Sequence, residues 1–242
     1  MGDSEPGAGQ GQPGSRALAG RLEFRPRPSA GRAEGFDGPL GLSTVRDGIL
    51  YVPDTVERSA PVLVYLHGAG GSARRELRLV LAAADRYGVV IAAPDSRDQT
   101  WDVLTGGFGP DVQFVDRVLD AVTDRCDVDP TRLAIGGISD GASYALTMGL
   151  ANGDVFEAIV ALSPGFAAPG GLVGKPRVFV SHGVHDRILP IDACSRRLVP
   201  ALEREGYDVT YVEFDGGHDA PPPIADRAFR WLCRTDAEAG SG

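Results

Sequence analysis

The residues best suited to do chemistry lie at 137–141, where the chain reads GISDG. Apolar residues that favour a strand precede this Gly-x-Ser-x-Gly pattern, and a helix-compatible run follows at 142–150. The pattern predicts a strand, a sharp turn and a helix, with Ser139 at the apex as a nucleophile. Gly137 and Gly141 leave room where strand and helix nearly touch. The helix N-terminus offers free N–H groups to a developing negative charge.

A glycine-rich loop lies upstream, directly after a predicted buried strand at 61–66. It reads HGAGG at 67–71, and its glycines allow backbone N–H groups to turn inward. A phosphate-binding loop is the alternative interpretation. However, no Lys-Ser or Lys-Thr follows, and the loop lacks the Gly-x-Gly-x-x-Gly spacing, so the sequence argues against a nucleotide site here.

Two more loops follow predicted strands and carry an acid and a base. The strand at 177–181 leads into HGVHD, which ends on Asp186, and the strand at 209–214 leads into a Gly-Gly-His turn that ends on His218. Asp186 could instead cap the helix that begins near Ile191, although Asp192 could also do this. A histidine on such a turn can swing over the carboxyl edge of a sheet, whereas a lone histidine is usually an ordinary surface residue.

A metal site is another interpretation of these loops, with His182, His185, Asp186 and His218 as ligands. The sequence lacks His-Glu-x-x-His and any cysteine pair at ligand spacing, which argues against it. Of the four histidines, His67, His182 and His185 lie in the two earlier loops, which leaves His218 as the candidate general base. We therefore predict neither a metal nor an organic cofactor.

Together these motifs resemble the α/β-hydrolase superfamily. Within it they are most similar to lidless serine esterases of the phospholipase/carboxylesterase and polyhydroxybutyrate-depolymerase-like families. The resemblance covers roughly residues 50–233 in motif order. It implies a catalytic triad in the chain order Ser139, Asp186, His218, with Asp186 as the triad acid.

The sequence departs from the usual family pattern in two places. Asp140 follows the nucleophile where Gln, Met or Ala is more common, and Ala69 stands where many depolymerase-like relatives carry Cys. Neither change removes a backbone N–H. The oxyanion hole implied by the resemblance would therefore use the N–H groups of Asp140 and of Ala69, or of Gly70 in place of Ala69.

Strands and helices alternate along the chain, which predicts an α/β fold with a mostly parallel central sheet and helices on both faces. Two early strands at 21–25 and 42–53 are expected to open the sheet as an antiparallel pair. The remaining strands are predicted at 61–66, 89–93, 133–138, 158–162, 177–181 and 209–214. The helices are predicted at 72–87, with Ser72 as N-cap, and at 111–126, 193–205 and 220–233.

We predict one domain at 21–235, between a disordered N-terminal arm at 1–20 and a flexible tail at 236–242. Residues 163–176 connect two core strands where related hydrolases often insert a lid. Half of them are glycine or proline, which leaves too little room for a helical cap. We therefore predict a site without a large lid.

The loop at 94–110 is a candidate wall of the substrate pocket. It contains Trp101, Asp102 and Phe108, and ordinary loop packing is the alternative for these side chains. We also consider His67, Gly70 and Ile188 as substrate contacts, since each lies in or beside a loop of the predicted site.

Composition limits location and partners. The chain has 242 residues, enough for one domain with a sizeable core, and a net charge of −9, which argues against nucleic acid or an anionic membrane as partner. No apolar run reaches the length needed to cross a bilayer. Three cysteines without motif spacing suit a reducing compartment, and Asp3 and Glu5 stand where a signal peptide would be basic. We predict a cytoplasmic protein.

These inferences predict a serine esterase that cleaves small carboxylic esters through an acyl-enzyme intermediate. Thioesterase, amidase and acyltransferase activities use the same triad and stay open as alternatives. A non-catalytic binding protein with this fold is a further alternative, and a complete set of triad candidates in the expected order argues against it.

Overall fold

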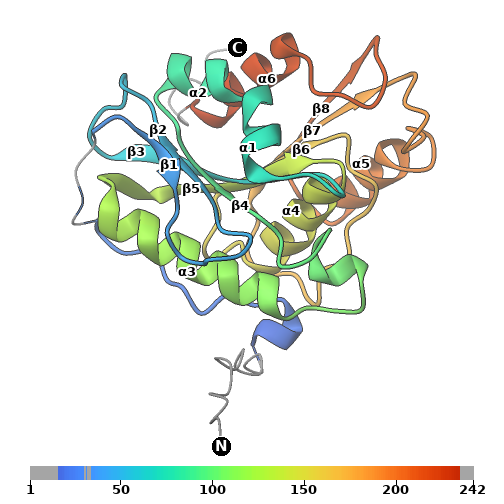
Figure 1. The fold of residues 1–242 in the computed structure, drawn as a ribbon. Coiled ribbons are helices and arrows are strands. Elements are labelled where there is room, and N and C mark those ends of the chain that lie inside the picture. Colours follow the sequence, from blue (N-terminus) through green and yellow to red (C-terminus); the bar gives the residue numbers. More distant parts are fainter. Residues whose placement is uncertain (1–15, 30, 32–33, 235–242) are drawn as a thin grey trace, which may run out of the picture.

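A computed structural model of the chain describes residues 16–29, 31 and 34–234. The predicted tail at 236–242 and most of the predicted N-terminal arm lie outside these residues. Within them, eight strands form one sheet in the order β1-β2-β4-β3-β5-β6-β7-β8 (Figure 1). The strands are β1 Phe36–Pro39, β2 Gly48–Val52, β3 Ala60–Leu66, β4 Val90–Pro94, β5 Val128–Ile138, β6 Ala158–Leu162, β7 Arg177–Gly183 and β8 Val209–Phe214.

The sheet is mostly parallel, as predicted. Strands β3 to β8 pair in parallel, whereas β1 pairs antiparallel with β2, and β2 antiparallel with β4. The carboxyl ends of the parallel strands therefore share one edge, where the loops of the predicted site emerge. Ligands bind at this edge in open α/β sheets.

Helices cover both faces of the sheet (Figure 1). Alternate residues of β3 point to opposite faces of the sheet and belong to two separate cores. Val62 and Val64 lie in the first core, and Leu63 and Tyr65 lie in the second. The first core packs against α3 Pro110–Arg125, α4 Asp140–Ala151 and α5 Ser195–Arg204. The second packs against α1 Ala73–Glu76, the 3-10 helix η2 Leu77–Leu79, α2 Leu81–Tyr87 and α6 Pro222–Leu232.

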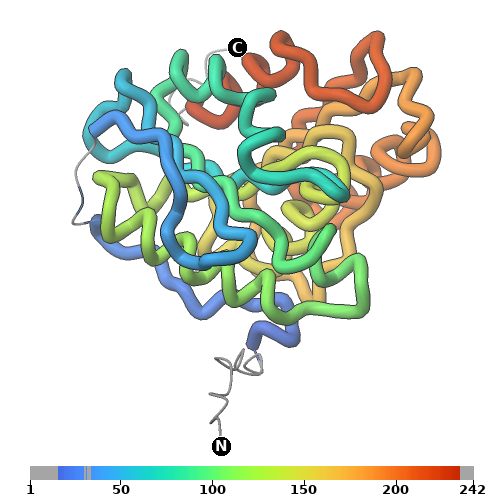
Figure 2. The backbone as a smooth tube through the Cα atoms, viewed as in Figure 1, coloured from blue at the N-terminus to red at the C-terminus, as the bar shows by residue number. Residues whose placement is uncertain are grey.

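The predicted strand at 21–25 is wrong. Leu22 and Phe24 are buried in alternation, as a strand would require, but their N–H groups donate to side chains. The Leu22 N–H binds Asn152 Oδ1 at 2.8 Å, and the Phe24 N–H binds Asp116 Oδ1 at 2.8 Å. The segment thus runs beside α3 instead of joining the sheet (Figure 2). The predicted antiparallel pair exists, but β1 and β2 form it.

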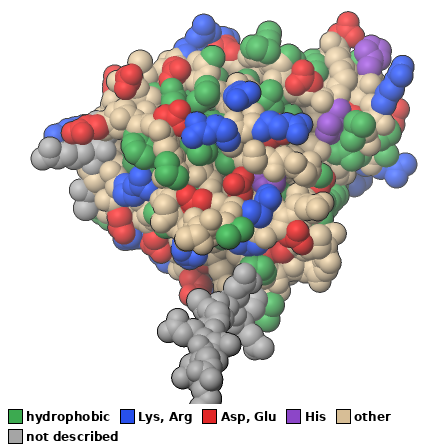
Figure 3. All heavy atoms as spheres, in the orientation of Figure 1, with side chains coloured by type: hydrophobic (Ala, Val, Ile, Leu, Met, Phe, Trp, Pro, Cys, Tyr) green, Lys and Arg blue, Asp and Glu red, His purple; other side chains and the backbone are tan. Residues whose placement is uncertain are grey.

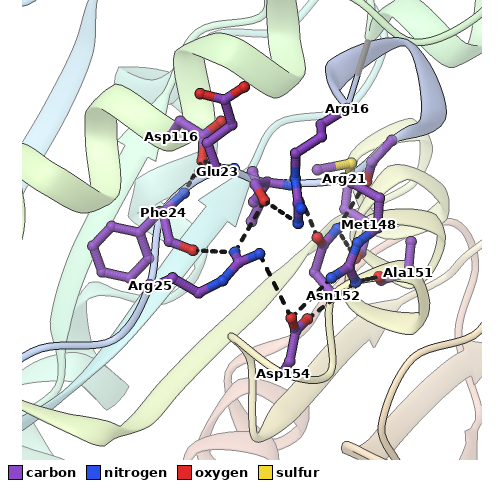
Figure 4. A network of polar contacts seen from close by, with 12 residues as sticks. Arg16, Arg21, Glu23, Phe24, Arg25, Asp116, Met148, Ala151, Asn152 and Asp154 are labelled. Carbon is purple, nitrogen blue, oxygen red and sulfur yellow. Dashed lines mark hydrogen bonds and ion pairs between the residues drawn. The ribbon is translucent and has the colours of Figure 1, made fainter. Parts of the chain in front are cut away.

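The segment is fastened at the end of α4 (Figure 4). Asn152 is fully buried, and its Nδ2 donates to the Gly20 and Met148 carbonyls at 2.8 Å each. The Arg21 guanidinium donates to both carboxylate oxygens of Asp154, at 3.0 and 2.8 Å. The end of the arm predicted to be disordered also folds, because Ala17–Ala19 forms the 3-10 helix η1 with Ala17 buried.

The helix predicted at 72–87 is divided into α1, η2 and α2. Ser72 stands at the N-cap position, but its side chain makes no capping hydrogen bond. Asp95, at the end of β4, accepts the Ala73 N–H at 2.7 Å instead. No helix in the described part of the chain is long and apolar enough to span a membrane.

Candidate active site

Ser139 occupies the turn between β5 and α4, with φ 58° and ψ −122°. Such backbone angles cost a non-glycine residue about 1–3 kcal/mol and persist only where the surroundings impose them. Here the Ser139 N–H donates to the Leu162 carbonyl at 3.0 Å, and the Ser143 N–H donates to the Ser139 carbonyl at 3.0 Å. The predicted strand-turn-helix elbow is therefore present and held from both sides.

The two glycines of the elbow are required by close packing against β3. A Cβ on Gly137 would lie 2.5 Å from the Leu66 carbonyl oxygen, and one on Gly141 would lie 2.1 Å from the same atom. Real Cβ atoms do not come so close to backbone, so only glycine fits at either position. The sequence predicted a need for glycine from the closeness of strand and helix at the elbow, and the nearest atoms belong to the neighbouring strand β3.

The glycine-rich loop after β3 lies beside Ser139, since a Cβ on Gly68 would be 3.3 Å from Ser139 Cβ. Within the described residues, the N–H groups of Ala69 and Asp140 donate to no acceptor. The Gly70 N–H donates to the Gln99 carbonyl at 2.9 Å, so Gly70 is not available as the alternative oxyanion donor.

Asp186 and His218 meet at the carboxyl edge of the sheet. His218 Nδ1 lies 2.6 Å from Asp186 Oδ2, and Oδ1 accepts the N–H groups of Ile188 and Leu189 at 2.9 and 2.8 Å. Burial alone would raise the pKa of the Asp186 carboxyl, but these hydrogen bonds, led by that from His218, hold the pKa below its usual range. The carboxylate thus stays ionised beside the imidazole.

Backbone contacts join the loops that carry these two residues. A Cβ on Gly183, at the end of β7, would lie 2.2 Å from the Gly217 carbonyl oxygen. The His185 N–H donates to the Gly216 carbonyl at 2.9 Å. Gly183 was not predicted to matter for the site, although its place in the HGVHD loop three residues before Asp186 was a usable signal.

His67 was predicted as a substrate contact, and this is wrong. Its side chain is fully buried, with Nδ1 2.7 Å from the Gly68 carbonyl oxygen. Nε2 accepts the Ser96 N–H at 3.0 Å. The imidazole ring therefore holds the glycine-rich loop from the protein interior, and neither ring nitrogen is free to bind a substrate.

Trp101 and Asp102 likewise belong to the interior, so the packing alternative applies to them. The Trp101 indole is 1% exposed, donates to the His67 carbonyl at 2.9 Å and stacks on Tyr144. Asp102 Oδ2 accepts the N–H groups of Gly109 and Asp111, which anchors the loop to the start of α3. Trp101 therefore packs inside the fold, whereas Asp102, although mostly buried, also lines a surface pocket together with Arg97 and Thr100.

Two other positions remain open to a substrate. Ile188, beside Asp186, exposes 70% of its surface, and Gly70 is exposed in the glycine-rich loop.

Thr100, which the sequence did not single out, donates its hydroxyl to Asp140 Oδ2 at 2.8 Å. This contact joins residues 40 positions apart, so no local pattern could have revealed it.

Three of the four residues of the alternative metal site come together, since His182 and His218 both contact Asp186, but the fourth does not join them. His185 points into solvent, where its Nε2 lies 3.0 Å from the exposed Asp215 carboxylate. In the described part of the chain, no three His, Cys, Asp or Glu side chains are grouped so that they could hold a metal ion.

No protein-family model matches the chain. By sequence it is similar to feruloyl esterase C of Emericella nidulans, 23% identical over 230 residues that cover 81% of this chain and 84% of that protein. It is also similar to feruloyl esterase B of Thermothelomyces thermophilus, 30% identical over 118 residues that cover 45% of this chain and 40% of that protein.

Two solved structures show the same architecture. The crystal structure of esterase PE8 superposes with a TM-score of 0.61 at 24% identity, covering 76% of this chain and 96% of that one. The substrate-bound fluorophosphonate-binding serine hydrolase F of Staphylococcus aureus gives a TM-score of 0.65 at 16% identity, covering 83% of this chain and 97% of that one. The chain therefore has the α/β-hydrolase fold, as the sequence predicted.

Proposed function

We propose that this α/β-hydrolase is a carboxylic ester hydrolase of the serine esterase type, with Ser139 as nucleophile, His218 as general base and Asp186 as the acid. The observation that carries the assignment is the 2.6 Å contact between His218 Nδ1 and buried Asp186 Oδ2, at the sheet edge where the strained Ser139 turn emerges. Similarity to named esterases, by sequence and by structure, supports the same reaction class.

The proposed reaction begins when Ser139 Oγ attacks the ester carbonyl carbon and its proton passes to His218 Nε2. The N–H groups of Ala69 and Asp140 then stabilise the oxyanion, at about 3–4 kcal/mol per donor. Cleavage of the ester C–O bond expels the alkoxide, which takes the proton from His218. Water, deprotonated by His218, attacks the acyl-enzyme carbonyl carbon. The bond from that carbon to Ser139 Oγ then breaks, the carboxylic acid leaves, and Ser139 Oγ takes the proton back from His218.

Asp186 acts through the imidazole. Because Nδ1–H of His218 donates to the carboxylate, the neutral ring keeps its lone pair on Nε2, which is the nitrogen that must accept the serine proton. The ionised carboxylate also stabilises the imidazolium that forms in each half-reaction.

The substrates we propose are small esters that reach the site from solution. Residues 163–176 contain no helix or strand, so no lid is built there. Exposed Ile188 supplies an apolar contact at the rim beside the acid. Because two relatives are feruloyl esterases, feruloyl esters are the first natural substrate class to test.

We extend the proposal to a cytoplasmic location without nucleic acid or stable membrane association. Cys126, Cys194 and Cys233 are free thiols, which suits a reducing compartment. Acidic and basic side chains are interspersed on the face in Figure 3, and the net charge is −9. A net negative charge disfavours the binding of a polyanion.

The test compares kcat/KM for nitrophenyl esters of increasing acyl length, methyl ferulate, an acyl thioester and an anilide. The proposal expects ester turnover well above thioester and amide turnover, with Ser139→Ala inactive on all of them. Preferred turnover of the thioester or anilide would reassign the chain to the thioesterase or amidase alternative. Product transfer to an added alcohol in preference to water would indicate an acyltransferase.

A further inference from the structure

A second histidine contacts the proposed catalytic acid from inside the protein. His182, in β7, is fully buried, and its Nε2 lies 2.8 Å from the Leu189 carbonyl oxygen and 3.1 Å from Asp186 Oδ2. Its Nδ1 lies 2.7 Å from Oγ of Ser195, the fully buried first residue of α5. Serine, histidine and aspartate therefore form a connected chain, but at a depth that no substrate reaches.

The partners of His182 determine where its proton lies. Nε2 faces two oxygen atoms, both of them acceptors, so this nitrogen must carry a hydrogen. In the neutral ring Nδ1 then has the lone pair and needs a donor. The Ser195 hydroxyl, 2.7 Å away, can rotate its hydrogen toward Nδ1. Ser195 thus selects the tautomer that lets His182 donate to the Leu189 carbonyl beside the acid.

The consequence is that three hydrogen-bond donors hold Asp186, with His182 as a further close contact. Two backbone N–H groups bind Oδ1 and His218 binds Oδ2, while His182 Nε2 lies 3.1 Å from Oδ2. His182 also binds the carbonyl of Leu189, whose own N–H binds the acid, so one ring fixes both the carboxylate and its loop. Hydrogen bonds around a carboxylate of this kind set the direction in which it presents its remaining lone pairs.

We infer that His182 and Ser195 are positioning residues: they fix the Asp186 carboxylate in the orientation that aligns His218 for proton transfer. The inference rests on the proposed function, because it needs Asp186 and His218 to act on Ser139. Neither residue touches substrate, so their loss should lower kcat with little change in KM. A misplaced catalytic group can cost up to about a hundredfold in rate.

Three substitutions distinguish a positioning role of His182 and Ser195 from a role in packing alone. His182→Leu fills the space but removes the donor, and we expect kcat to fall roughly 10- to 100-fold. His182→Gln keeps an N–H group near the Nε2 position and should recover most of that loss. Ser195→Ala removes only the hydroxyl that selects the tautomer and should lower kcat by roughly 3- to 10-fold.

Two matched controls come from the same strand and loop. Ser181 is fully buried beside His182, and its Oγ has no hydrogen-bond partner in the described part of the chain, so Ser181→Ala deletes a similar hydroxyl at similar depth without touching the network. His185→Ala removes the exposed histidine of the acid loop. Both variants should keep the wild-type kcat.

The readout is kcat and KM on a nitrophenyl ester, together with the far-downfield proton NMR signal of the His218–Asp186 hydrogen bond and the melting temperature. We expect this NMR signal to shift in His182→Leu and Ser195→Ala and to return toward its wild-type position in His182→Gln. Wild-type kcat and an unmoved signal in Ser195→Ala would overturn it, even if His182→Leu fails to fold. Activity that persists in Ser139→Ala would instead overturn the proposed function.

Discussion

Gly183 and Gly217 bring the acid loop and the histidine loop into backbone contact: a Cβ on Gly183 would lie 2.2 Å from the Gly217 carbonyl oxygen, whereas a Cβ on Gly217 would meet nothing within 4 Å. We therefore expect Gly183→Ala to force the loops apart and to lower kcat by about 100-fold, because it displaces Asp186 from His218. Gly217→Ala is the matched control and should stay near wild type. Steady-state kinetics on one ester decides this, and equal effects of the two substitutions would contradict it.

The buried amide of Asn152 should matter more for stability than the ion pair beside it. Asn152→Ala leaves the Leu22 N–H and two carbonyls without their partner, so we expect a loss of about 2–3 kcal/mol in the free energy of unfolding. Arg21→Ala removes a partly exposed ion pair and should cost about 1 kcal/mol or less. Urea denaturation measures both, and the reverse order would show that the segment at 16–29 is held mainly by charge.

Stability should depend on pH through Asp111. Burial, and then the charge of Asp102, raise the pKa of Asp111 to about 7. Because the folded pKa lies above the unfolded value of about 3.9, the folded state binds this proton more tightly. The stabilisation is fully present below the unfolded pKa and is lost as pH rises through about 7.

Asp111→Asn removes the titrating group and keeps a similar shape. The free energy of unfolding of the wild type, minus that of the variant, should therefore decrease steadily between pH 4 and pH 7. The exposed Asp120 of the same helix supplies the control Asp120→Asn. A difference that stays constant over this range in denaturation curves would show that Asp111 does not titrate there.

The acid assignment is tested by Asp186→Asn. This variant should fold but lose roughly 10³–10⁴ in kcat, because the amide no longer holds His218 in the productive tautomer. Asp192→Asn and Asp215→Asn are controls, since both carboxylates are exposed and bind Arg196 and His185 instead. If either control variant loses activity while Asp186→Asn keeps it, the control residue and not Asp186 is the acid of the triad.

The sequence predicted those parts of the site that depend on local pattern. Ser139, Asp186 and His218 each follow a core strand, and the alternation of strands and helices places all three at one edge of the sheet. Burial was harder to predict. His67 and Trp101 lie in loops of the site, yet both side chains turn inward, because each completes hydrogen bonds deep in the fold.

Contacts between distant segments could not be predicted at all. A strand was predicted at 21–25, where Leu22 and Phe24 are buried, but the partners of their N–H groups lie on α3 and just after α4. The hydroxyls of Thr100 and Ser195 likewise acquire their roles from residues brought near by the fold. No spacing in a single sequence encodes such pairs.

The central claim is that Ser139 is an activated nucleophile, and labelling by a fluorophosphonate probe, measured beside ester turnover, tests it most directly. The wild type should be labelled once per chain and lose ester turnover in proportion. Ser139→Ala should show neither labelling nor turnover, with the melting temperature of a folded protein. If Ser139→Ala is labelled and hydrolyses the ester at the wild-type rate, the serine hydrolase assignment is wrong.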